Sequence, residues 1–109
     1  MPATEADNAG FPPVGDIDRI VHEPARLRIL AVLSVVESAD FLFLLRHTGL
    51  TKGNLSSHLS KLEAAGYVEM QKEFVDKIPR TLLQLTQKGR AAFQAYRQSM
   101  IEALESLPG

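Results

Sequence analysis

Apolar residues recur at helical spacing through most of this chain, and at strand spacing in one stretch near its middle. Leu55, Leu59 and Leu62 follow one another at intervals of four and three, so they share one helix face. Thr51 is a favourable amino-terminal cap because its hydroxyl accepts from a free backbone N–H of the first turn. Gly66 suits the left-handed residue that ends a helix. The pattern predicts a helix over 52–65.

Four further segments show helical spacing, and turn residues separate them. These predicted helices span 16–21, 24–37, 41–48 and 87–106. Pro24 is well placed as the first residue of its helix. In that helix Leu30 and Val35 belong to the predicted buried stripe, whereas Arg26 and Arg28 are expected near the exposed side.

Two of these helices form a helix-turn-helix. Asp40 is a cap candidate for the helix 41–48, Gly49 ends it, and the next helix begins two residues later. Leu42 and Phe43 exceed what the core face of so short a helix requires. Two interpretations stay open for them: a contact with another subunit, or a helix buried more deeply than usual.

Beyond the helix-turn-helix the apolar period changes to two. Residues 67–72 and 81–86 alternate in this way and predict a pair of strands. The hairpin segment 73–80 lies between them, and Pro79 is expected to prevent a regular central strand there. Residues 39–41 offer one more short strand to this sheet.

The last predicted helix carries an apolar seam that is longer than one small domain needs. The seam residues are Phe93, Tyr96, Met100, Leu104 and Leu107. The first half of the seam can cover the core, but the second half has little to cover unless another chain supplies it. We therefore expect this helix to form a homodimer, in preference to packing back on its own domain.

Length and composition limit the classes of function. The 109 residues suffice for one domain, expected over 16–109, and the apolar fraction is 45%. Segment 1–15 is rich in proline and lacks a basic region, so a disordered arm is expected there and a secretory signal is not. No apolar run approaches the roughly 18 residues of a membrane span. The absence of cysteine excludes thiolate metal sites and fits a cytoplasmic protein.

Charge is distributed unevenly along the chain. Residues 1–40 carry a net charge of −4, residues 41–97 carry +5, and residues 98–109 carry −2. The positive block includes the helix-turn-helix and the hairpin, as expected for a nucleic-acid surface within a nearly neutral protein.

Metal binding and catalysis are not expected. The histidines His22, His47 and His58 lie in three separate segments without the spacing of a metal site. No phosphate-binding glycine motif or nucleophile elbow occurs, and Ser57 next to His58 points away from it on a helix. We therefore predict no metal, no cofactor and no enzyme activity.

The face opposite the leucines suits a DNA major groove because its side chains are small, polar or cationic. That face carries Lys52, Gly53, Asn54, Ser57, Ser60, Lys61 and Ala64. A serine-rich surface helix without a ligand would look similar. In the hairpin, Lys72, Lys77 and Arg80 are placed to contact phosphate, and Arg80 to enter a minor groove.

Two sequence runs resemble the compact MarR/ArsR-like transcriptional regulators. They are LTKGNLSSHLSKLEAAGYV at 50–68, and PRT at 79–81 continuing to LTQKGRAAF at 85–93. The resemblance covers about 20–97 and implies a mainly α fold with a small β-wing, a winged helix-turn-helix with a carboxy-terminal dimerisation helix. It implies a dimeric regulator that binds double-stranded DNA, with helix 52–65 in the major groove and the wing 73–80 on the backbone or minor groove.

Carried over to this chain, the resemblance assigns DNA contacts to Lys52, Asn54, Ser56, Ser57 and Lys61 in the major groove and to Arg80 at the wing. Thr51 and Lys77 complete the set of expected DNA contacts. His58 borders the leucine face, so we expect it to be partly buried and to pack or cap, not to read bases. Ser57 stands where an arginine is common, which predicts weaker base reading. The alternative function is a winged-helix module that binds protein and not DNA.

Overall fold

The computed structural model describes residues 18–108, so the predicted arm 1–15 lies outside the described residues. The elements in order are α2 (Pro24–Ser34), β1 (Ala39–Asp40), α3 (Phe41–Thr48), α4 (Lys52–Ala64), β2 (Val68–Val75), β3 (Ile78–Leu85) and α5 (Gln87–Glu105). The expected helix-turn-helix, the two main strands, the short strand near residue 39 and the last helix are confirmed, but the strands continue into the expected hairpin segment 73–80 and leave only a two-residue turn between Val75 and Ile78.

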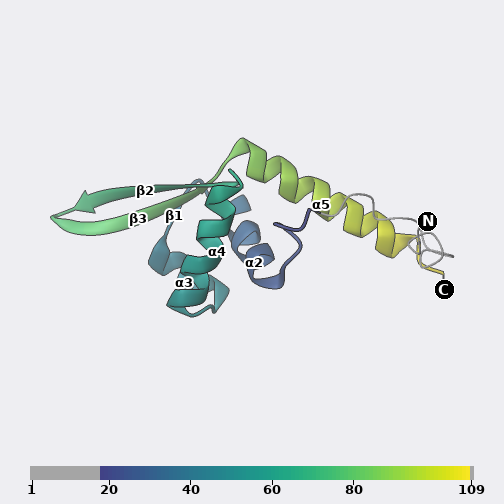
Figure 1. Cartoon of the computed structure of the whole chain (residues 1–109), viewed down its shortest axis with the longest axis horizontal. Helices are drawn as coiled ribbons and strands as arrows, with labels where there is room; N and C mark the ends of the chain where they lie inside the picture. Colours follow the sequence, from purple (N-terminus) through teal and green to yellow (C-terminus); the bar gives the residue numbers. More distant parts are fainter. Residues whose placement is uncertain (1–17, 109) are drawn as a thin grey trace.

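Helices α2, α3 and α4 pack together beside the base of the sheet (Figure 1). The β2–β3 hairpin, which we call the wing, projects from this body on one side, and α5 projects on the opposite side. The long axis of the molecule measures 59 Å. The buried apolar core is formed by Val21, Ile29, Leu30, Leu33, Ala39, Leu44, Leu55, Leu59, Leu62, Val68, Leu83 and Leu85.

Helix α2 differs from the prediction in its end and in its buried face. It stops at Ser34 and not at 37, and Val35, expected in the core, is 81% exposed as the residue that caps the helix. The buried positions are Ile29, Leu30 and Leu33 together with Arg26, which was expected near the exposed side. Arg26 occupies a buried position because its charged group finds acceptors there, as described below.

The segment before α2 is a capped turn. Of the predicted helix 16–21, the structure describes residues 18–21, and these form a turn and not a helix. The Asp18 carboxylate accepts hydrogen bonds from the backbone N–H groups of Ile20 and Val21 at 2.9 and 3.3 Å. An Asp side chain that satisfies nearby backbone donors in this way competes with helix formation.

The three strands are antiparallel in the order β1-β3-β2. The prediction that Pro79 prevents a regular central strand is wrong, since β3 runs through it opposite Phe74. Strand β1 pairs only with Leu82 and Leu83, so β3 has one open edge at Pro79. The neighbouring pair Val75–Ile78 closes the hairpin turn, so the missing N–H of proline would face that open edge.

The start of helix α5 makes a close contact with Tyr67, the residue just before β2. Thr86 caps α5, its hydroxyl accepting from the backbone N–H of Gly89 at 2.9 Å, and its own N–H donates to the Tyr67 carbonyl at 3.0 Å. A Cβ atom at Gly89 would lie only 2.1 Å from that carbonyl oxygen. Glycine at this position therefore allows α5 to start directly against the strand that follows α4.

Candidate nucleic-acid interface

Helix α4 is fixed to the core by one face and leaves the other in solvent. Leu55, Leu59 and Leu62 are at most 1% exposed, as their spacing predicted. The exposed residues of the helix are Lys52, Gly53, Asn54, Ser56, Ser57, Ser60, Lys61, Glu63 and Ala64. The structure thus brings all the predicted major-groove residues of α4 onto its solvent side.

The start of α4 is defined by local hydrogen bonds. The hydroxyl of Thr51 accepts from the backbone N–H of Asn54 at 3.2 Å, which confirms the predicted cap. Gly49 ends α3 in a left-handed conformation, with φ of 72°. Arg28 of α2 donates to the carbonyl of Thr48 at 3.3 Å and so fixes the end of α3. These contacts hold the turn and leave the first turn of α4 exposed.

His58 is half-buried on the side of α4 that faces α2, as the helical phase predicted. Its Nδ1 lies 3.2 Å from Nη1 of Arg26, and its Nε2 lies 3.9 Å from a carboxylate oxygen of Glu23. Burial would raise the pKa of Glu23, but the backbone N–H of Arg26, the nearby His58 and the N–H of Ala25 together hold it below its ordinary value. The His58 side chain therefore points toward the start of α2 and does not belong to the solvent face of α4.

The tip of the wing is a two-residue turn. Asp76 and Lys77 both have positive φ, 52° and 67°, as a tight hairpin of this hand requires. Lys77 is thus presented at the extreme end of the wing. Phe74 and Ile78 beside it are 75% and 67% exposed. The wing end therefore combines one cation and one acid with large apolar side chains.

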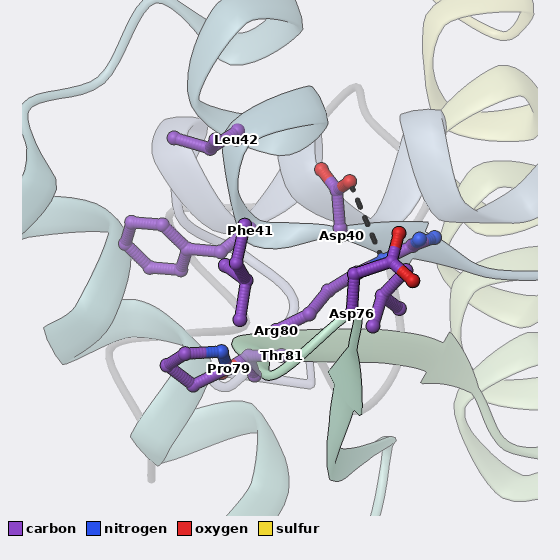
Figure 2. Close-up of a pocket in the computed structure, with 9 residues that line it drawn as sticks. Asp40, Phe41, Leu42, Asp76, Pro79, Arg80 and Thr81 are labelled. Carbon is purple, nitrogen blue, oxygen red and sulfur yellow. Dashed lines mark ion pairs between the residues drawn. The ribbon is translucent and has the colours of Figure 1, made fainter.

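Arg80 lies closer to the body of the protein than Lys77 does. Its Nε is 3.7 Å from carboxylate oxygens of both Asp40 and Glu73, and Figure 2 shows it turned toward Asp40. A DNA phosphate would have to compete with these two carboxylates for the Arg80 charge. Lys77 has no such neighbour among the ion pairs of residues 18–108.

A groove of about 450 Å³ separates the start of α3 from the wing (Figure 2). Leu42 lines it and is 60% exposed. Phe43 instead packs against the core and stacks on His47, with ring centroids 4.0 Å apart. Of the two open interpretations, burial in the core applies to Phe43, whereas Leu42 remains at the surface.

The apolar seam of α5 changes character along its length. Phe93 and Tyr96 are half-buried against the core, and the Tyr96 hydroxyl lies 2.7 Å from Nδ1 of His22. Leu104 and Leu107 are 63% and 46% exposed. The far half of α5 projects beyond the body of the domain (Figure 1).

Neither a metal cluster nor a membrane-spanning helix is found among the residues that the structure describes. Within residues 18–108, no group of three potential metal ligands lies close enough to hold an ion. No helix in the same range has both the length and the apolar character needed to cross a bilayer.

A helix-turn-helix followed by a two-stranded wing is the architecture that the comparisons also identify. The family model of the winged helix DNA-binding domain matches residues 25–104. This chain belongs to that family. A Methanocaldococcus jannaschii protein named only as uncharacterised is 35% identical over 89 residues, covering 82% of this winged-helix chain and 97% of its own length.

Solved structures agree with this assignment. The transcriptional regulator homologue protein from Pyrococcus horikoshii OT3 is 31% identical, with a TM-score of 0.77 over 81% of this chain and 87% of that one. A MarR-family transcriptional regulator from Silicibacter pomeroyi is 26% identical, with a TM-score of 0.58 over 80% of this chain and 56% of that one. The resemblance to MarR-like winged-helix regulators is confirmed.

Sequence reasoning missed the part that Arg26 plays in this winged helix. Its side chain is 9% exposed and reaches His58, which lies 32 positions away in the chain. Helical phase signalled that His58 would be partly buried, but it did not identify the partner.

Proposed function

We propose that this winged-helix protein is a homodimeric, cytoplasmic transcriptional regulator that acts by binding double-stranded DNA and not by catalysis. Helix α4 enters the major groove, and the wing lies along the backbone or the minor groove. The proposed contacts are Thr51, Lys52, Asn54, Ser56, Ser57, Lys61, Lys77 and Arg80.

The solvent face of α4 carries this proposal. It has small and hydrogen-bonding side chains with two lysines, while the leucine face is fully buried. Such a face fits the width of a major groove, and amide side chains such as Asn54 pair with adenine edges there. The family match over 25–104 supports the same placement, because it includes both α4 and the wing.

Dimerisation is supported by the far half of α5. Leu104 is exposed on a helix that extends past its own core, Leu107 is exposed just beyond the end of that helix at Glu105, and a second copy of α5 would bury them. Two α4 helices related by a two-fold axis would then contact half-sites about one helical turn, or roughly 10 bp, apart.

The test begins with selection of bound duplexes from a random pool. Affinity for the selected duplex and for an unrelated one is then measured by fluorescence anisotropy across a salt series. We expect Lys61→Ala to weaken both duplexes alike, since a phosphate contact carries no sequence information, and Asn54→Ala to reduce discrimination between them. If the folded protein bound no duplex even at low salt, the proposal would be refuted.

The dimer is tested separately by sedimentation. Leu104→Glu should yield monomers, because it places a charge in the proposed apolar seam. Gln98→Glu, at an exposed position of α5 outside the seam, should leave the dimer intact. A wild-type protein that sediments as a monomer at micromolar concentration would exclude this interface.

A further inference from the structure

Arg26 is a nearly buried cation whose three guanidinium nitrogens each have a hydrogen-bond partner. Its Nε donates to the carbonyl of Ile20 at 2.6 Å, and its Nη2 donates to the carbonyl of Arg19 at 3.4 Å. Its Nη1 lies 3.2 Å from Nδ1 of His58 on α4. A single guanidinium therefore joins the turn before α2 to the helix proposed to read DNA.

The geometry at His58 fixes which ring nitrogen carries the proton. A guanidinium only donates, so Nδ1 of His58 must accept from Arg26 and the proton of the neutral ring lies on Nε2. That nitrogen faces Glu23 at 3.9 Å. Glu23 also accepts from the backbone N–H of Arg26 at 2.8 Å. His58 is thus held between two groups, each at the start of α2.

The same turn contacts two other parts of the fold. His22 pairs with the hydroxyl of Tyr96 on α5 at 2.7 Å. Asp18 accepts a hydrogen bond from the hydroxyl of Tyr67, which lies between α4 and β2. Residues 18–23 therefore contact the proposed dimer helix on one side, and on the other both His58 of α4 and the segment that joins α4 to β2.

These polar contacts supply something that the leucine face of α4 does not. Leu55, Leu59 and Leu62 bind α4 to the core, but apolar burial has no preferred direction and tolerates small rotations. Hydrogen bonds depend on distance and angle, so the contacts of His58 fix the rotation of α4 about its axis. A small rotation of α4 would displace base-reading side chains such as Asn54, while the leucines would stay buried in the core.

We propose that Arg26 and His58 are positioning residues for DNA recognition, and that the turn 18–23 links the orientation of α4 to the position of α5. Through this link, the arrangement of the two subunits sets the angle at which α4 meets a base pair. The inference rests on the proposed function, because it assumes that α4 contacts DNA.

Two substitutions of His58 separate its contacts. His58→Asn places an amide oxygen close to the position of Nδ1, so the acceptor for Arg26 is kept and the contact with Glu23 is lost. His58→Gln places its amide near Nε2, which has the reverse effect. We expect His58→Asn to bind the selected duplex within about twofold of wild type, and His58→Gln to bind it at least fivefold more weakly. Neither should change affinity for an unrelated duplex.

The control is His47→Asn, because His47 is exposed and, within residues 18–108, both its hydrogen bond and its ring stacking are with Phe43 of its own helix. A merely structural role for His58 would lower the thermal midpoint and weaken both duplexes together. That result, or wild-type discrimination by His58→Gln, would overturn the inference. Failure of the wild-type protein to bind any duplex would refute the proposed function instead, so the two failures are distinguishable.

The link to α5 is tested with Tyr96→Phe, which removes the hydroxyl that contacts His22 and keeps the ring. Sedimentation first establishes that this variant is still a dimer. We expect it to weaken specific binding about threefold, and the double variant with His58→Gln to be no weaker than His58→Gln alone, because both changes break one chain of contacts. Losses that simply multiply would show that α5 and α4 act independently, contrary to the inference.

Discussion

The contact at Gly89 predicts a large loss of stability from one added methyl group. In Gly89→Ala the new Cβ would lie 2.1 Å from the carbonyl oxygen of Tyr67, 2.8 Å from its carbonyl carbon and 2.9 Å from a methyl group of Leu85. Backbone atoms cannot rotate away as a side chain does. The start of α5 must therefore move by about 1 Å relative to β2 to restore an ordinary contact.

The cost follows from what that movement disturbs. Overpacking of a close contact costs about 1–3 kcal/mol. Moving α5 away from the Tyr67 carbonyl would also break the hydrogen bond that the N–H of Thr86 donates to it. The loss of this hydrogen bond adds about 1 kcal/mol. Alanine returns up to about 1 kcal/mol through helix propensity. The net loss is about 1–3 kcal/mol, or roughly 4–24 °C in the melting midpoint of a domain this size.

Gly53→Ala is the matched control, since a Cβ there meets no atom within 4 Å. It should stabilise α4 by up to about 1 kcal/mol. Thermal and urea unfolding followed by circular dichroism measure both variants. If Gly89→Ala unfolded at or above the wild-type midpoint, the close approach of α5 to β2 would be disproved.

Three further predictions concern charge. The hydrogen bond to Asp18, with burial and the Asp18 charge, raises the pKa of Tyr67 to about 12. Asp18→Asn should lower this pKa in an NMR titration. The contribution of the Tyr67–Asp18 pair to the free energy of unfolding should be complete below pH 10 and should disappear as the pH rises through 12. The pKa of Glu23 is depressed below 4.5, so as the pH falls through that region the free energy of unfolding should decrease more in wild type than in Glu23→Gln, by urea titration. Lys77→Ala removes one phosphate contact from each subunit and should reduce the salt slope of DNA binding by the proposed dimer by about 2, whereas Arg80→Ala should change it less because two carboxylates already pair with Arg80.

The features that the sequence predicted correctly depend on neighbouring residues. The cap at Thr51, the leucine stripe of α4 and the left-handed Gly66 each follow from a few adjacent positions, and the structure confirms them. Their spacing alone also placed the lysines of α4 on the side opposite the core. Local chemistry therefore sufficed to locate α4 and its exposed face.

The features that sequence reasoning misjudged depend on distant partners. Arg26 is buried because acceptors on Ile20, Arg19 and His58 surround it, and no periodicity reveals such a set. Pro79 fits inside β3 because β1 ends before reaching it, which depends on the length of another strand. Helical spacing does not determine these contacts.

The cations available to each subunit predict that tight DNA binding requires the proposed dimer. If Arg80 remains with its carboxylates, one subunit offers Lys52, Lys61 and Lys77 to phosphate. Three contacts give a salt slope of about −3 and two subunits give about −5, at −0.9 for each phosphate. Release of Arg80 to DNA in both subunits would instead give about −7. A slope near −5 for wild type and near −3 for the Leu104→Glu monomer would therefore support both the dimer and the retained Arg80 pairs, whereas equal slopes would contradict a dimeric binding unit.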